Sequence, residues 1–350
     1  MRTLLALLAA ATTALPAVTA SPSAPGAVTA CTVRDARLAG LSGLAVTADG
    51  YVAVSDSNVD KSRIRIFWLD KRCGYVRSVG YPTSAYDPED LAVGRDGTLY
   101  VADIGDNGRT RSSIAIWRLA PGSTRPQLFR YAYPDGAHDA EALLLAADDT
   151  PIVVTKDPLT AGIYVPTAPA DPGGTPVPLR RAGTFTPQDT GTPNGLGIVG
   201  EYVVTGGANS PDRSRVALRT YAAAYEWAVP DGDVVKAITT GTPEVTPLPD
   251  EPQGESIAYT PDGRSLVTVS DVETDPPTAP ILRYPAAPVA TSAGTVPSPA
   301  GKAPTSKGAT AGGVAPGGLR TGLLAVTGAA VVALAIALVI AALVRRRRPR

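Results

Sequence analysis

The chain has 350 residues, 44% of them hydrophobic, and its 32 basic residues balance its 32 acidic ones. A chain of this length and composition can bury a sizeable core. The body has no basic face interleaved with aromatic residues, which argues against a nucleic-acid partner. One histidine and two cysteines exclude most zinc sites and leave any serine–histidine–aspartate triad dependent on a single residue.

The first 20 residues have the features of a secretory signal peptide. A charged start is followed by an apolar run over residues 4–15 and by small residues that end at Ala20. We expect export and cleavage after Ala20, although residues 28–31 also have the look of a lipobox ending at Cys31. Cys31 and Cys73 are the two cysteines of this exported chain, so we predict a disulfide between them.

A hairpin unit recurs about every 50 residues between residues 31 and 287. Its clearest copy covers residues 87–107, with a strand, a tight turn at Arg95-Asp96-Gly97 and a second strand. Such units cannot bury their faces alone and stack around a common core. The pattern predicts an all-β propeller of five blades, or six if residues 187–249 form two short blades. A strand over residues 31–38 is expected to complete the last blade and close the ring.

The third strand of each copy carries one large aromatic residue. We expect these rings to fill the space between neighbouring blades. They are Trp68, Trp117, Tyr164, Trp227 and Tyr284.

Acidic residues recur at matching positions of the hairpins. Three copies open with a glutamate, at Glu89, Glu141 and Glu255, and the second strand ends in a charged residue in four copies, at Asp56, Asp103, Lys156 and Asp271. The start of one strand and the end of the next share an edge of an antiparallel hairpin. These residues are therefore predicted to ring one mouth of a central channel, with Asp106 and Asn107 above it.

Carboxylates held close together raise each other's pKa unless a cation or a hydrogen-bond donor compensates. Calcium takes six to eight oxygen ligands, so one hypothesis is a calcium site. Its predicted metal ligands are Glu89, Glu141, Glu255 and Asp271. The predicted ligand-binding residues are Asp56, Asp103, Asp106, Asn107 and Lys156. The alternative is that each carboxylate only caps backbone N–H groups of a neighbouring blade.

The segment Asp-Gly-Thr-Leu-Tyr-Val-Ala-Asp at residues 96–103 resembles blades of NHL-type and gluconolactonase/paraoxonase-like propellers. In the order of its segments, the region is more similar to uncharacterised exported bacterial propellers. The lactonase resemblance implies a calcium-dependent hydrolase with Glu89, Glu141 and Glu255 at the acidic ligand position, but the asparagines of the lactonases do not recur here. His138 precedes Glu141 and can act as a general base, or it is simply a solvated turn residue. No catalytic residue is assigned.

The C-terminal part separates into a spacer, an apolar segment and a basic tail. Residues 288–320 are rich in Pro, Gly, Ala, Ser and Thr and predict an extended, disordered spacer. Residues 322–344 are long and apolar enough to form a transmembrane helix, and the arginine-rich residues 345–350 form its cytoplasmic flank. The folded region is expected outside the membrane.

Within this apolar segment the pentapeptide Leu-Ala-Val-Thr-Gly resembles the sorting signal of Gram-positive surface proteins, in the form used by class E sortases. The matching positions are Leu324, Ala325, Thr327 and Gly328. The resemblance implies cleavage after Thr327 and transfer to cell-wall peptidoglycan, with a sortase as partner. The alternative is a plain type I single-pass membrane anchor.

Together these features predict a cell-surface binding module that takes an unidentified ligand or protein partner at an acidic channel mouth. The competing hypothesis is a metal-dependent extracytoplasmic hydrolase acting on lactones or phosphoesters.

Overall fold

The computed structural model describes residues 26–56, 61–249, 251–272, 274 and 276–288. The predicted signal peptide, the spacer beyond residue 288, the membrane segment, the sorting motif and the basic tail lie outside the described residues. Within the described part of the chain, no helix is both long and apolar enough to cross a bilayer.

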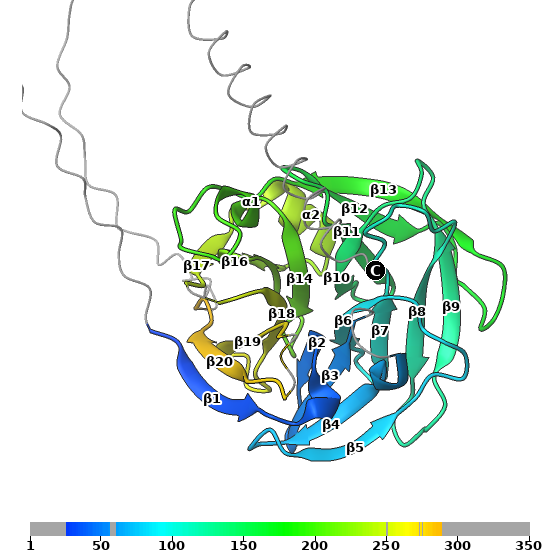
Figure 1. The fold of residues 1–350 in the computed structure, drawn as a ribbon. Helices are drawn as coiled ribbons and strands as arrows, with labels where there is room; N and C mark the ends of the chain where they lie inside the picture. The colour runs from blue at the N-terminus through cyan, green and yellow to red at the C-terminus, as the bar shows by residue number, and fades with distance from the viewer. Residues whose placement is uncertain (1–25, 57–60, 250, 273, 275, 289–350) are drawn as a thin grey trace, which may run out of the picture.

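The regular structure of the described chain is almost all β-strand, arranged as antiparallel four-stranded units in chain order (Figure 1). The first unit contains β2 (Leu41–Val46), β3 (Gly50–Ser55), β4 (Ile66–Asp70) and β5 (Tyr75–Val79). The second contains β6 (Pro88–Val93), β7 (Leu99–Asp103), β8 (Ile114–Leu119) and β9 (Gln127–Ala132). The third contains β10 (Ala140–Leu145), β11 (Pro151–Thr155), β12 (Ala161–Pro166) and β13 (Val177–Phe185).

Two further units follow. The fourth contains β14 (Val204–Asn209), β15 (Arg215–Thr220), β16 (Ala223–Ala228) and β17 (Glu244–Pro247). The fifth contains β18 (Gly254–Tyr259), β19 (Ser265–Ser270), β20 (Ala279–Pro285) and β1 (Val28–Val33). Residues 187–249, where one long or two short blades were expected, thus contribute a single four-stranded sheet, with α1 (Ile198–Glu201) before it and α2 (Val234–Thr240) between its last two strands.

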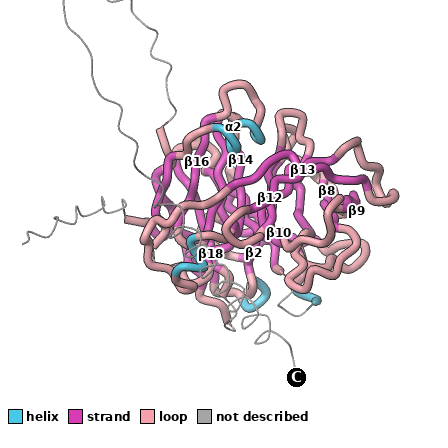
Figure 2. The backbone as a smooth tube through the Cα atoms, turned by 90° about the horizontal axis from the view of Figure 1, so that it is seen from above, coloured by secondary structure: helices cyan, strands magenta, loops and turns pink. Residues whose placement is uncertain are grey.

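The first strands of the units pack side by side in a closed circle. β2 lies next to β6, β6 next to β10, β10 next to β14, β14 next to β18, and β18 next to β2. Figure 1 shows these strands near the centre and the last strands at the rim, and Figure 2 shows the same ring at right angles. Apolar clusters fill the spaces between units, so the predicted all-β, propeller-like arrangement is confirmed in its coarse form.

The second and third units are also joined at their outer strands. β9 and β13 pair in parallel where Tyr131 faces Val177 and Ala132 faces Pro178. Because of this pairing, the eight strands of the two units form one sheet.

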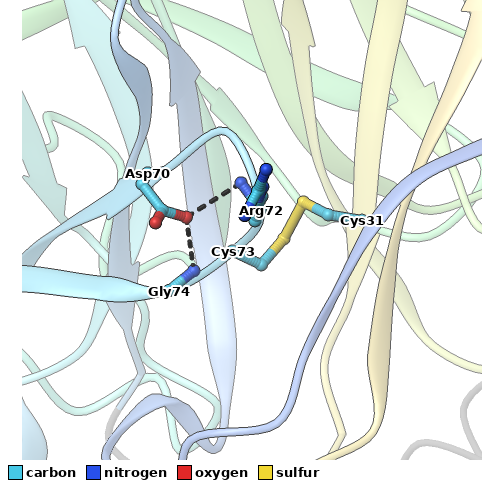
Figure 3. The surroundings of a disulfide bond; sticks show 5 residues. All are labelled: Cys31, Asp70, Arg72, Cys73 and Gly74. Atoms are coloured by element: carbon cyan, nitrogen blue, oxygen red, sulfur yellow. Dashed lines mark hydrogen bonds between the residues drawn. A yellow bond between two sulfur atoms is a disulfide. The ribbon is translucent and has the colours of Figure 1, made fainter.

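The N-terminal strand closes the circle, as predicted, although it lies slightly earlier than residues 31–38. β1 pairs with β20, and residues Ala36–Leu38 form a short 3-10 turn. The Cys31–Cys73 disulfide is present, with a Cα–Cα distance of 5.8 Å. Figure 3 shows that it joins β1 to the turn after β4, where Asp70 accepts the backbone N–H groups of Arg72 and Gly74 at 2.8 and 2.7 Å.

Local sequence explains the hairpin turns. Gly97 has a φ of +83°, in the left-handed region that favours glycine, and Asp96 accepts the N–H of Thr98 at 2.8 Å. The aromatic residues of the third strands pack inward, with Trp117, Tyr164, Trp227 and Tyr284 buried and Trp68 partly buried.

Candidate functional site

A β-bulge interrupts the first strand of every unit, next to its start. The pairing registers skip one residue in each hairpin, between Leu41/Gly43, Pro88/Asp90, Ala140/Ala142, Val204/Gly206 and Gly254/Ser256. The skipped residues are Ser42, Glu89, Glu141, Thr205 and Glu255. Since bulges redirect side chains, this local irregularity explains how the three glutamates leave the regular alternation of the sheet.

The three bulge glutamates converge although they come from three different units. One carboxylate oxygen each from Glu89, Glu141 and Glu255 lie within 4.8 Å of one another, and all three residues are buried. In the two units without a glutamate, a hydroxyl takes this place and bonds to the next unit. Ser42 Oγ donates to the Glu89 carbonyl at 2.8 Å, and Thr205 Oγ1 donates to the Gly254 carbonyl at 2.8 Å.

Side chains, rather than backbone N–H groups, supply the hydrogen bonds to these glutamates within the described residues. Ser42 Oγ also donates to Glu89 Oε2 at 2.9 Å, and Lys156 Nζ forms an ion pair with Glu141 Oε1. Glu255 Oε1 accepts the Tyr221 hydroxyl at 3.1 Å and Gln253 Nε2 at 2.8 Å. The other oxygen of Glu141, Oε2, is buried and has no hydrogen-bond partner within the part of the chain that the structure describes.

A second acidic group shares Glu255 with the first. Oxygens of Asp56, Glu255 and Asp271 also lie within 4.8 Å of one another. Gln253 Nε2 links Glu255 to Asp271, whose Oδ2 it reaches at 3.0 Å. The predicted ligand Asp271 is therefore near Glu255 in a set separate from that of Glu89 and Glu141. We call the residues of both sets, together with Lys156, the acidic mouth.

The charges of the acidic mouth shift one another's pKa values. Burial raises the pKa of Glu89 well above its ordinary value, and neighbouring carboxylates, led by Asp87, raise it further. Burial likewise raises the pKa of Glu141, even though Lys156 opposes the shift. Burial alone would lower the pKa of Lys156, but Glu141 and other acidic neighbours raise it well above normal, so this side chain stays cationic.

The fourth unit contributes Tyr221, which sequence analysis missed. Tyr221 follows β15 as Lys156 follows β11, Asp56 follows β3 and Asp271 follows β19. Its ring lies 5.4 Å from Lys156 Nζ. Aligning the weak fourth copy by the end of its second strand would have identified this position.

Asp103 is offset by one residue from the positions expected to match it. It pairs with Pro88 as Ser55 pairs with Leu41, so the residue equivalent to Asp56 is Ile104. Because side chains alternate along a strand, the Asp103 carboxylate turns toward its own unit. There it accepts bonds from the backbone of Tyr86 and Asp87 and from Arg111 and Trp117, at 3.0–3.1 Å.

Asp106 and Asn107 lie in the loop after β7. Asp106 is buried and accepts the backbone N–H groups of Thr110 and Arg111 at 3.0 and 2.7 Å, whereas Asn107 is exposed. Asp106 thus organises its own loop. Ligand contacts by Asp103, Asp106 and Asn107 stay predictions.

Asp90, beside the bulge of the second unit, ties three units together. Its carboxylate is fully buried and accepts N–H groups of Leu91 at 2.8 Å, Leu143 at 2.7 Å and Gly207 at 3.1 Å. Burial raises its pKa well above the ordinary value although these donors oppose the shift. Asp90 thus has the backbone-capping role that was the alternative expectation for the glutamates. Its sequence context is that of an ordinary strand residue.

His138 is held on both ring nitrogens. Nδ1 lies 3.0 Å from Asp157 Oδ2, and Nε2 lies 3.1 Å from both Asp135 Oδ1 and the Tyr164 hydroxyl. Tyr133 packs edge-on against the imidazole with ring centroids 5.0 Å apart. The His138 imidazole is therefore anchored, and it joins the loop before β10 to the loop after β11.

No family model matches the chain, and no curated protein matches it. Among solved structures it is similar to a streptogramin B lyase, with 14% identity, a TM-score of 0.35, and coverage of 70% of this chain and 65% of that chain. It is also similar to selenomethionine-substituted virginiamycin B lyase from Staphylococcus aureus, with 11% identity, a TM-score of 0.33, and coverage of 69% of this chain and 65% of that chain. The chain therefore spans less than two thirds of either protein, and likeness at this level carries no argument about activity or ligand.

Proposed function

We propose that the protein is a surface-displayed binding module, built as a five-bladed propeller, whose acidic mouth holds a calcium ion and binds a ligand or partner through it. The five units are the blades, and β1 completes the last one. The binding role is non-catalytic.

One observation carries the cation proposal. Glu141 is only 3% exposed, its Oε2 has no hydrogen-bond partner among the described residues, and its carboxylate is one of three that converge. A buried acceptor without a partner costs about 1–3 kcal/mol, and more when it is charged. A cation bound between Glu89, Glu141 and Glu255 would give this oxygen a partner.

The charge balance of the acidic mouth supports the same proposal. Three buried carboxylates converge in the first group, and among the described residues one of them, Glu141, is ion-paired, with the ammonium group of Lys156. At a separation of 4 Å two like charges repel by about 4 kcal/mol at the effective dielectric of a protein surface. A divalent cation offsets this repulsion while the carboxylates stay ionised. Protonation offsets it only by neutralising the carboxylates.

The donor set favours calcium over magnesium. Oxygen ligands from three separate units suit the flexible six- to eight-fold coordination of calcium, which waters or ligand oxygens would complete. When bound, the ion would supply a positive charge that attracts carboxylate or phosphate oxygens of a partner. Lys156, whose side chain retains 17% exposure, would contact the same group from beside the ion.

The test is calorimetric titration of calcium into the full chain. We expect saturable binding that Glu141→Gln weakens at least tenfold. Glu244→Gln is the matched control, because Glu244 is an exposed glutamate on the outer strand β17. Absence of calcium binding at millimolar concentration, or equal weakening by both substitutions, would refute the cation site. Turnover of a lactone or phosphoester that Glu89→Gln abolishes would instead replace the binding role by hydrolysis.

The export and attachment parts of the proposal rest on the sequence. Residues 1–20 direct export, residues 288–320 hold the propeller away from the surface, and residues 322–350 anchor it as a membrane segment or through sortase transfer to peptidoglycan. Calcium is abundant outside cells, which is consistent with a cation site of modest affinity there.

A further inference from the structure

A cavity of about 510 Å³ opens at the end of the ring opposite the acidic mouth. Two of the first strands show that the cavity and the acidic mouth lie at opposite ends of the ring. On β6, Glu89 near the start belongs to the acidic mouth, whereas Val93 at the far end and Arg95 in the turn that follows line the cavity. On β18, Glu255 and Tyr259 are divided in the same way. The cavity therefore belongs to a separate site.

The inner wall of this cavity is apolar. It reaches between the first and second units and toward the central axis, where several first strands meet. Its buried apolar lining includes Leu44, Ala45, Val52, Leu91, Leu99 and Ile257. A volume of this size with mainly apolar walls falls in the range of small-molecule sites.

The rim is cationic. Three arginines, Arg77, Arg95 and Arg213, line the cavity, and no aspartate or glutamate of the described chain is among its lining residues. Arg77 lies over the Trp68 ring, with its guanidinium carbon 3.4 Å from the ring centroid. Cations grouped at the entrance of an apolar cavity are complementary to an anionic head on an apolar body.

Both Arg95 and Arg213 interact with Asp149, but in different ways. Burial lowers the pKa of Arg213, and the charge of Arg95 lowers it further. Asp149 compensates Arg213 with an ion pair of 2.7 Å, but it offers Arg95 only a bond to the backbone N–H. The Arg95 side chain donates through Nε to the Ala147 carbonyl at 2.9 Å, which leaves its charge without a carboxylate partner in the described contacts.

We propose that this cavity binds a small amphiphilic anion, with an aromatic or branched apolar body against Leu44, Leu91 and Ile257 and a carboxylate or sulfonate head at the arginine-lined rim, where Arg95 is its first contact. The second site goes beyond the cation-binding role of the acidic mouth and does not depend on it.

The test uses anilinonaphthalene sulfonate, which has an aromatic body and one anionic head, in a fluorescence titration of the full chain. We expect saturable one-to-one binding that naphthoate displaces and that naphthol, its neutral counterpart, does not displace at the same concentration. Arg95→Gln is expected to weaken binding about tenfold, in line with the loss of one charge-assisted contact.

Two further variants separate the cavity from other apolar parts of the chain. Val93→Trp, at a lining residue that is 39% exposed, would fill the cavity and abolish binding without adding side-chain volume to the buried core. Arg34→Gln is the matched control, because Arg34 is exposed and lies outside the cavity lining. The C-terminal segment is the same in all variants, so dye bound there would not respond to these changes.

Several results would overturn the proposal: no saturable binding, equal displacement by naphthol, or equal weakening by Arg34→Gln and Arg95→Gln. Thermal unfolding of each variant, measured without dye, shows whether the fold is retained. If Val93→Trp is unfolded, the Arg95→Gln result and the naphthoate-to-naphthol comparison still decide.

Discussion

Removal of the Cys31–Cys73 disulfide should destabilise the protein by an amount that follows from its loop. The bond closes a loop with a sequence separation of 42 residues. The chain-entropy relation gives about 13 cal/mol/K for a loop of this length, or about 3.9 kcal/mol at 25 °C. For a domain of this size such a loss lowers Tm by roughly 8–16 °C. The effect should be centred on β1 and β20, because Cys31 lies in β1.

The assay is urea unfolding of three forms of the protein: the oxidised wild type, the wild type reduced with dithiothreitol, and the double variant Cys31→Ala/Cys73→Ala. We expect the last two to coincide and to be less stable than the first by about 3–4 kcal/mol. Amide exchange should show β1 opening more often in the reduced form. A stability loss below about 1 kcal/mol would refute the reasoning, because the ring would then stay closed without the covalent bond.

Three further predictions concern the axis and the tail. Asp90→Ala leaves three buried backbone N–H groups without an acceptor, so we expect a loss of at least about 3 kcal/mol in urea unfolding. The raised pKa values of Glu89 and Glu141 mean that these two carboxyls hold their protons to a higher pH in the folded protein than in the unfolded chain. Their contribution to stability in EDTA should therefore be greatest below the ordinary glutamate pKa and be lost as the pH rises above it. Added calcium should flatten this dependence of Tm, and a Tm that rises with pH in EDTA would contradict the shifts. Finally, Thr327→Ala should remove the protein from the cell-wall fraction in an immunoblot, and an unchanged wall fraction would rule out sortase attachment.

The convergence of the acidic residues could be predicted from the sequence because it follows from repetition. Glu89, Glu141 and Glu255 occupy one position in three copies of a hairpin, and equivalent positions in a closed ring face the same opening. The disulfide was predictable for a similarly simple reason, since Cys31 and Cys73 are the only cysteines in the sequence.

The finer arrangement depends on register, which the sequence pattern did not reveal. A bulge shifts the register of each first strand by one residue. Asp103 occupies the position that Ser55 has in the first unit, one residue before the position of Asp56, so its carboxylate turns away from the acidic mouth. Tyr221 was missed because the fourth copy is the most degraded. Asp90 was missed because only the folded chain brings N–H groups from β10 and β14 to its carboxylate.

The position of Asp90 has a consequence for the two proposed binding sites. Its carboxylate sits between Glu89, in the acidic mouth, and Leu91, in the wall of the opposite cavity, and it is bonded across three units. The Asp90 carboxylate therefore cross-links three units between the two ends of the ring. The calcium ion proposed for the acidic mouth and the anion proposed for the cavity would lie on opposite sides of this cross-link, so the two would not compete for space.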